Sequence, residues 1–204
     1  MKPKKLMKLL FVIAAFLALA HLAPAQELME ELFGWRLSIH GVKDGATFSE
    51  LRFDETDKVN GKGCLAFDVK GESSPDLWLA VIADKLPAPV DLTQQQALAF
   101  SYKLVARDLG SANGKPVIGM RLCLSNLTGT NTVFYAAPYL EGDEWQEVVV
   151  PVELFKDHPD NVDPWDRTDV ARINVEQMLQ GIQTMDYTLK IANLHFIPAQ
   201  ETKK

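Results

Sequence analysis

The stretch YTLKIANLHFIP, residues 187–198, carries a clear strand pattern and a break in it. Leu189 and Ile191 are apolar at alternate positions, as a half-buried strand requires. Leu194 and Phe196 continue the apolar pattern, but at even-numbered positions instead of odd-numbered ones. One face of a strand can hold both pairs only if an extra residue lies between them. The sequence therefore predicts a β-bulge at Ala192–Asn193.

Similar strand patterns recur over most of the chain. They occupy residues 47–53, 63–71, 77–83, 97–106, 117–125, 132–140, 145–152 and 188–197. Gly, Pro, Asn, Asp and Ser dominate the segments between them, which indicates turns and loops rather than crossover helices. We predict an all-β fold, a two-sheet antiparallel β-sandwich. Residues 167–185 fit either an amphipathic helix or a turn followed by a strand, and we favour the turn and strand.

The N-terminal residues have the composition of a secretory signal peptide. Four lysines precede a 12-residue apolar run at 9–20, and Ala23-Pro24-Ala25 is a typical cleavage pattern. The run is shorter than the roughly 20 residues that span a bilayer. We expect a signal peptide at 1–25 that forms a helix, an N-terminal segment at 26–44, the β-sandwich at 45–198 and a flexible tail at 199–204. The protein is then secreted or periplasmic, with no membrane insertion after cleavage.

The charge of the chain restricts its partners. The formal net charge is −6, and without the four lysines of the signal there are 27 acidic against 17 basic residues. We therefore expect no nucleic acid and no anionic membrane among the partners, which should be neutral or cationic. The two cysteines, Cys64 and Cys123, fit either a disulfide or two separate buried thiols.

Four motifs, in their order along the chain, resemble those of a known superfamily. They are VNGKGCLAFDVKG (59–71), VDLTQQQALAFSYKLV (90–105), GDEWQEVVVPVELF (142–155) and YTLKIANLHF (187–196). The order resembles that of galactose-binding-like jelly rolls, namely carbohydrate-binding modules of families 11 and 30 and the complex I intermediate-associated protein 30 family. The resemblance implies a galactose-binding-like jelly roll with an accessory, non-catalytic role.

The resemblance also bears on metal binding. Many relatives have an Asp at the bulged position that helps to hold a structural calcium ion, and the matching residue here is Ala192. Because Ala192 offers no side-chain oxygen, we expect the bulge to persist without a metal site. The acidic loop at 156–169 lacks the spacing of an EF-hand, so its Asp residues are expected to cap turns. We expect no cofactor.

No sequence pattern for catalysis is present. The chain contains no H-E-x-x-H, G-x-S-x-G or P-loop motif. Beyond the signal, its histidines are His40, His158 and His195, far apart in the sequence. We therefore expect that the protein is not an enzyme and has no catalytic residues.

Aromatic side chains are the best candidates for ligand binding. Strand parity suggests that Arg121, Tyr135 and Tyr139 line one concave face, where rings can stack on a sugar. The alternative is that these tyrosines belong to the core. We expect Trp78, in a continuous apolar run, to be buried. The sequence thus predicts a secreted, non-catalytic binding domain for a poly- or oligosaccharide, or alternatively a protein–protein interaction or assembly domain with a partner in the cell envelope.

Overall fold

The computed structural model describes residues 34–41, 45–72, 77–111, 117–139, 142–162, 164–180 and 182–199. The expected signal peptide, much of the N-terminal segment and nearly all of the tail lie outside these residues. The elements are β1 (Trp35–His40), β2 (Thr47–Phe48), β3 (Arg52–Val59), β4 (Lys62–Glu72), β5 (Trp78–Ala83), η1 (Leu92–Gln94), β6 (Gln95–Ser111), β7 (Val117–Ser125), β8 (Thr132–Pro138), β9 (Gly142–Pro151), η2 (Val152–Leu154), β10 (Lys156–Asp157), β11 (Arg172–Gln180) and β12 (Ile182–Pro198).

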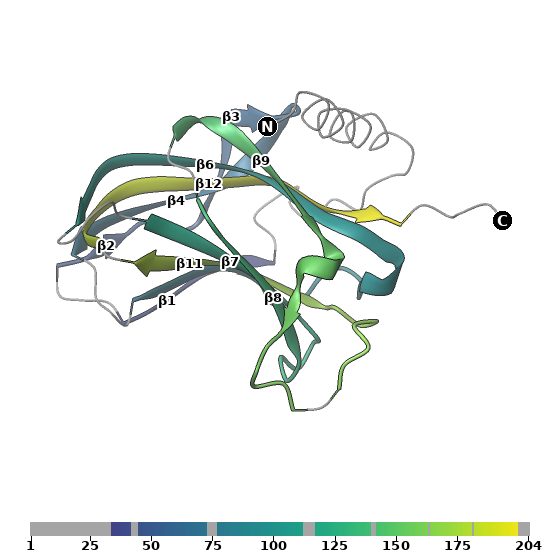
Figure 1. Cartoon of the computed structure of the whole chain (residues 1–204). Helices are drawn as coiled ribbons and strands as arrows, with labels where there is room; N and C mark the ends of the chain where they lie inside the picture. The colour runs from purple at the N-terminus through teal and green to yellow at the C-terminus, as the bar shows by residue number, and fades with distance from the viewer. Residues whose placement is uncertain are drawn as a thin grey trace, which may run out of the picture.

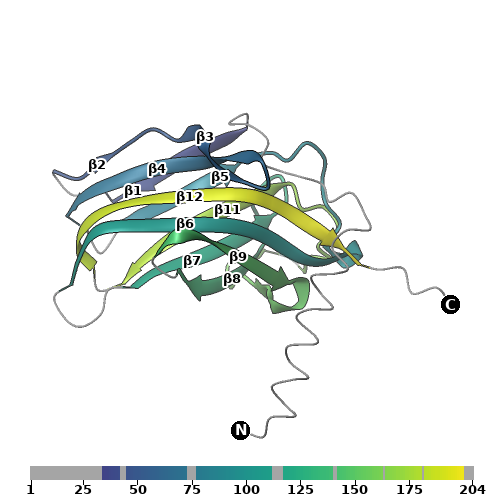
Figure 2. The same ribbon diagram turned by 90° about the horizontal axis from the view of Figure 1, so that it is seen from above.

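The described strands form two antiparallel sheets that pack face to face (Figure 1). One sheet has the order β2-β4-β12-β6-β9, with β3 also paired to β4, and we refer to it as the β12 sheet. The other has the order β1-β5-β11-β7-β8-β10 and is the β11 sheet. The long strands β6 and β12 arch over the β11 sheet, as the view from above also shows (Figure 2). The predicted two-sheet antiparallel sandwich is confirmed.

The core lies between the two sheets and follows the period-2 pattern of their strands. On the β12 sheet, Phe67 of β4 and Leu189 of β12 point inward and are completely buried. On the β11 sheet, Val81 of β5 and Leu122 of β7 do the same. Alternate residues of these strands point outward, so each sheet also has an outer face.

The bulge predicted in the last strand is present. In the pairing of β12 with β6, Ala192 lies opposite Ser101 and His195 lies opposite Ala99, with a register shift between the two pairs. Asn193, inside the shift, has a φ of 57°. The inserted residue returns the strand to phase, and the side chains at 194 and 196 are buried as those at 189 and 191 are. The prediction of a bulge at Ala192–Asn193 is confirmed.

The ambiguous segment at 167–185 is extended and contains no helix in its described residues. Val170 forms an isolated bridge with Val90, β11 covers Arg172–Gln180, and β12 begins at Ile182. Ile173 and Val175 point into the core from β11 at alternate positions. The strand rather than the helix is therefore correct, although the strand already begins at Arg172 and Ile182 belongs to the next strand, β12.

Two boundaries differ from those expected. The predicted strand at 47–53 is divided into β2 and the start of β3, because residues 49–51 leave the sheet. Strand β1 pairs along its whole length with β5, so the sandwich includes residues before position 45. Among the described residues, none of the helical segments has the length and apolar character needed to cross a membrane.

A buried hydrogen bond connects the two sheets. The Tyr187 hydroxyl, on β12, donates to Oε1 of Gln177, on β11, over 2.5 Å. Both side chains are fully enclosed, at 0% and 1% exposure. The described part of the core therefore contains a polar link between the two sheets.

The cysteines are free thiols on opposite sheets. Cys64 lies on β4 and Cys123 on β7, and both are buried. Each belongs to the outward set of its strand, because its neighbours in sequence, Leu65 and Leu122, point into the core. Of the two alternatives left open by the sequence, the structure shows separate thiols.

Candidate functional site

The outer faces of the two sheets are the candidate binding surfaces. We call the outward side chains of β4, β12, β6 and β9, with the strand β3 that lies over them, the β12 face. We call the outward side chains of the β11 sheet the β11 face. The two faces differ in how completely their polar groups are paired.

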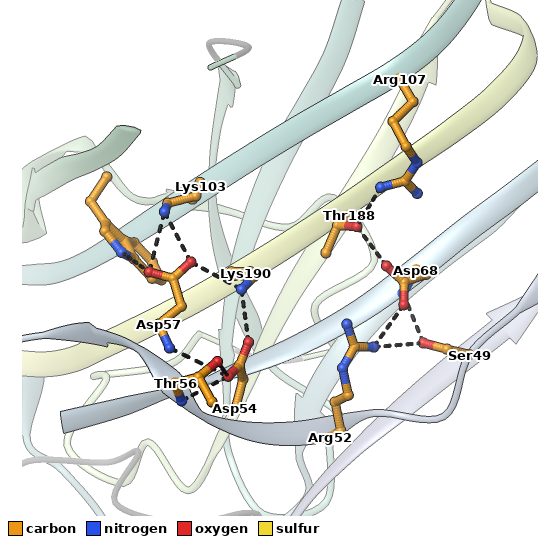
Figure 3. A network of polar contacts seen from close by, with 11 residues as sticks. Ser49, Arg52, Asp54, Thr56, Asp57, Asp68, Lys103, Arg107, Thr188 and Lys190 are labelled. Carbon is orange, nitrogen blue, oxygen red and sulfur yellow. Dashed lines mark hydrogen bonds and ion pairs between the residues drawn. The ribbon is translucent and has the colours of Figure 1, made fainter. Parts of the chain in front are cut away.

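The β12 face carries a compact cluster of charges (Figure 3). Lys190 of β12 donates to Asp54 over 2.7 Å and to Asp57 over 2.9 Å. Lys103 of β6 also donates to Asp57, over 2.9 Å, and its ammonium lies 5.3 Å from the ring centre of Trp145. The indole N–H of Trp145 donates to Asp57 over 2.9 Å. The Asp57 carboxylate thus accepts from three strands.

Strand β3 brings the two aspartates over the sheet. Its pairing with β4 is interrupted between Asp54 and Val59, so the residues in between are free of the regular ladder. Hydrogen bonds from Lys190 and Thr56 lower the pKa of Asp54 well below its usual range. Burial alone would raise the pKa of Asp57, but hydrogen bonds from Lys103, Lys190 and Trp145 lower it to about 2. Both aspartates are therefore charged at neutral pH and fix β3 in place.

A second group of polar contacts continues the cluster. Asp68 of β4 accepts from Arg52 over 2.8 Å and from the Thr188 hydroxyl over 2.5 Å. Arg107 of β6 donates to Thr188 over 2.8 Å and also to Asp186. Each carboxylate of the cluster is matched by a basic side chain. The polar groups of the β12 face therefore hold neighbouring strands together rather than form a surface open to a ligand.

On the β11 face, strand register places outward side chains in rows that run across the sheet. The three rows, read from β1 towards β8 or β10, are His40, Trp78, Met178, Gly119, Pro138; Ser38, Ala80, Glu176, Arg121, Ala136; and Arg36, Ile82, Asn174, Cys123, Phe134, Lys156. The first row continues from Trp78 to Met178 because these two residues lie one position beyond the paired residues Leu79 and Gln177. The residues of these rows that lie on β1, β8 and β10 are partly or fully exposed, whereas Ala80, Ile82, Glu176 and Cys123 in the middle are buried. The face thus has accessible margins around a less accessible centre.

A planar polar group lies in the middle of the β11 face. Arg121 of β7 forms an ion pair with Glu176 of β11 at 2.5 Å, and the Glu176 side chain is only 5% exposed. The amide of Asn174, one row away, donates to Glu176 over a long 3.5 Å. Its Oδ1 atom is buried and, within the described part of the chain, has no hydrogen-bond partner. This amide therefore keeps an acceptor whose hydrogen bond is unmade.

A second polar group lies beside the first. Asp84, directly after β5, accepts hydrogen bonds from Arg36 of β1 and Arg172 of β11. The bond from Arg172 measures 2.9 Å. The hydrogen bonds to the two arginines lower the pKa of Asp84, that of Arg36 most, against the opposing effect of burial. Guanidinium groups and carboxylates of this kind are suited to hydrogen bonding with a polar ligand.

Two aromatic rings frame these polar groups. Trp78 is partly exposed and its ring centre lies 5.2 Å from that of His40, with a tilt of 32°. Phe134 of β8 is also partly exposed and meets His158 edge-on, with the ring centres 5.8 Å apart. The β11 face therefore combines accessible rings with planar hydrogen-bonding groups.

The structure does not bring the three predicted binding residues onto one face. Arg121 points outward, opposite Ala136, whereas Tyr135 lies opposite the core residue Leu122 and points inward. The ring of Tyr135 packs near Phe155. Tyr139 is 5% exposed, and its ring stands edge-on to that of Tyr102. The expectation of a shared concave face is wrong, because Tyr135 and Tyr139 point into the core whereas Arg121 points outward. A role of these residues in ligand binding stays a prediction.

The aromatic residues that do face outward were not among the predicted binding residues. Trp78 was expected in the core, but it belongs to the outward row of β5 and is partly exposed. The sequence of β5 does not distinguish its outward positions from its core positions, because the outward residues Ala80 and Ile82 are apolar and buried as well. Phe134 precedes Tyr135 in the same strand and therefore has the opposite parity, but it was not among the residues predicted to bind.

The chain was compared with known proteins. No protein-family model matches it, and no curated protein matches its sequence. Solved structures do match it, and they include carbohydrate-binding modules of families 11 and 30, as the sequence resemblance implied. Whether the complex I intermediate-associated protein 30 family is also related stays a prediction.

Two of these structures are modules of cellulosomal cellulases from Clostridium thermocellum. The family 11 module of Lic26A-Cel5E aligns with a TM-score of 0.57 and 14% identity, over 88% of this chain and 96% of the module. The family 30 module of Cel9D-Cel44B aligns with a TM-score of 0.55 and 13% identity, over 89% of this chain and all of the module. A third structure is the Clostridium thermocellum family 11 module in complex with a β-1,3-1,4-mixed-linked tetrasaccharide; it aligns with a TM-score of 0.55 and 13% identity over 87% of this chain and 96% of that module. At these identities, the likeness establishes a common β-sandwich fold.

Proposed function

We propose that this protein is a non-catalytic, exported glycan-binding domain and that the β11 face is its binding surface. The observation that carries the proposal is the combination of the partly exposed Trp78 and Phe134 rings with Arg121, Glu176 and Asn174 in adjacent rows. A sugar ring presents C–H groups to an aromatic ring and hydroxyls to planar polar groups, and the two rings with the partly exposed Arg121, held in place by Glu176, offer both kinds of contact. The fold shared with carbohydrate-binding modules supports the same interpretation.

The β12 face is the weaker candidate. Its one aromatic side chain in the described cluster, Trp145, has its N–H bound to Asp57 and Lys103 near its ring. A ligand there would have to displace ion pairs that hold β3 to the sheet. We therefore assign binding to the β11 face.

The test is binding of the protein, with residue 26 as its first residue, to a panel of soluble polysaccharides by affinity electrophoresis and calorimetry. Replacing Trp78 by Ala should weaken binding at least about tenfold, because Trp side chains commonly contribute most of the binding energy of an interface. The matched control is Trp145→Ala, which removes the same side chain from the opposite face and should leave affinity unchanged. Circular dichroism establishes that both variants are folded.

Equal loss in both variants would contradict the placement on the β11 face. Silence of the unaltered protein across a broad panel would contradict glycan binding itself. In that case the alternative from the sequence, a domain that holds a protein partner in the cell envelope, becomes the next hypothesis to test.

A further inference from the structure

The β11 face has a charge opposite to that of the whole chain. The described outward residues of this sheet, with Asp84 beside them, include four basic side chains and two acidic ones. The basic residues are Arg36, Arg121, Lys156 and Arg172, and the acidic residues are Asp84 and Glu176. The face is therefore basic by two charges on a chain whose formal net charge is −6.

The charge cluster on the opposite face has no such excess. In the cluster of the β12 face, the basic residues Arg52, Lys103, Arg107 and Lys190 are balanced by Asp54, Asp57, Asp68 and Asp186. The positive charge is thus a property of one face and not of the sandwich in general.

The positions of the charged residues on the β11 face indicate where a ligand would meet positive charge. Glu176 is buried and neutralises Arg121, and Asp84 is shared by Arg36 and Arg172. Lys156 is exposed and forms no ion pair within the described part of the chain. Arg36 and Lys156 stand at opposite ends of one row, five strand spacings apart, which corresponds to about 24 Å. An extended chain lying across the strands along this row would meet a basic side chain at each margin and the Phe134 ring between them.

We propose that the β11 face binds an anionic polysaccharide, one that carries carboxylates such as a polyuronate, in preference to a neutral glycan. This inference rests on the proposed function and adds the class of ligand to it. Guanidinium groups bind carboxylates through paired hydrogen bonds. Lys156 adds attraction at the margin, and the aromatic rings contact the faces of the sugars.

The experiment compares two polymers that share one backbone, polygalacturonate and its fully methyl-esterified form. We expect the charged polymer to bind at least about tenfold more tightly than the ester, a difference equivalent to one charge-assisted hydrogen bond. The preference should shrink as NaCl rises from about 0.05 M to about 0.5 M, since salt screens exposed charges.

A pair of double variants locates the effect. Arg36→Gln with Lys156→Gln brings the face to neutrality and should remove the preference for the charged polymer, so that the two polymers bind equally tightly. Lys58→Gln with Lys70→Gln makes the same change in net charge at exposed positions of the β12 sheet and should retain the preference.

Each outcome is decisive. Equal binding of both polymers, or tighter binding of the ester, keeps the proposed function and overturns the anionic ligand. Binding of neither polymer, nor of any other glycan, rejects the proposed function first. Equally tight binding of a DNA oligonucleotide, or equal loss in the two double variants, would show general attraction of polyanions and also overturn the inference.

Discussion

At the scale of single residues, two buried tyrosines have opposite hydrogen-bonding states. The Tyr187 hydroxyl donates to Gln177, whereas the Tyr139 hydroxyl is buried and finds no partner among the described residues. Burial raises the pKa of both phenols, so both remain neutral in the folded protein. A buried polar group costs free energy when its hydrogen bond is unmade and contributes when it is made.

Replacing each tyrosine by Phe should therefore have different effects. Tyr187→Phe removes the link between the sheets and should lower the free energy of unfolding by about 1–2 kcal/mol. Tyr139→Phe removes an unpaired hydroxyl and should leave stability unchanged or raise it by up to about 1 kcal/mol. Urea unfolding followed by Trp fluorescence measures both. A loss in Tyr139→Phe as large as that in Tyr187→Phe would show that the Tyr139 hydroxyl has a partner.

The sequence alone does not show which aromatic residue of β8 faces outward. Strand parity places the neighbours Phe134 and Tyr135 on opposite sides of the sheet, but both are aromatic, so the pattern does not say which side is the core. That choice depends on Leu122, which lies opposite Tyr135 only because of the register between β7 and β8. Register between strands is set by contacts over the whole sheet and is not contained in one strand.

At the scale of elements, the bulge in β12 is the feature that the sequence predicted best. Its signal is local, because a change of parity between two pairs of buried residues within one strand requires an inserted residue. Asn193 takes the left-handed conformation, which Asn tolerates better than other non-Gly residues and β-branched residues resist. The residue type is thus consistent with the backbone at this position.

Substitutions at Asn193 should report this backbone requirement. Asn193→Gly should change the free energy of unfolding by no more than about 0.5 kcal/mol, since Gly adopts positive φ without a steric cost. Asn193→Val should lower it by about 1–3 kcal/mol. Urea unfolding of the two variants distinguishes these outcomes. Equal stability of the Gly and Val variants would mean that the bulge is accommodated elsewhere in β12.

At the scale of the whole molecule, the charge cluster of the β12 face connects four strands whose residues are distant in the sequence. No local pattern indicates that Asp57 meets Lys103, Trp145 and Lys190, because these contacts arise only when β3, β6, β9 and β12 are assembled. The same limit applies to the charge of the β11 face. The net charge of the chain led us to expect neutral or cationic partners, but an average over the chain does not give the sign of one face.

The cluster should make the stability of the whole protein depend on pH. The pKa of Asp57 is about 2 in the folded state against about 4 in an unfolded chain, and that of Asp54 is lowered further. A lowered pKa stabilises the folded state above the unfolded value, and this stability is lost as the pH falls through the folded value. The free energy of unfolding should therefore drop by about 2 kcal/mol or more between pH 5 and pH 2.

Urea unfolding at a series of pH values measures this drop. Asp57→Asn supplies the control, since it should be less stable than the unaltered protein at pH 7 and lose less between pH 5 and pH 2. A parallel pH dependence of the two proteins would exclude Asp57 as a source of the acid sensitivity.

The order of strands in the sheets also constrains when the protein can fold. Strand β12 lies between β4 and β6, and β11 lies between β5 and β7, so residues 172–198 form the middle of both sheets. A nascent chain that has not yet received these residues has no strand to join the halves of either sheet. Its apolar faces stay uncovered, and the long-range pairing that follows is slow by nature. The sandwich therefore folds only after β11 and β12 have been synthesised, rather than progressively along the chain.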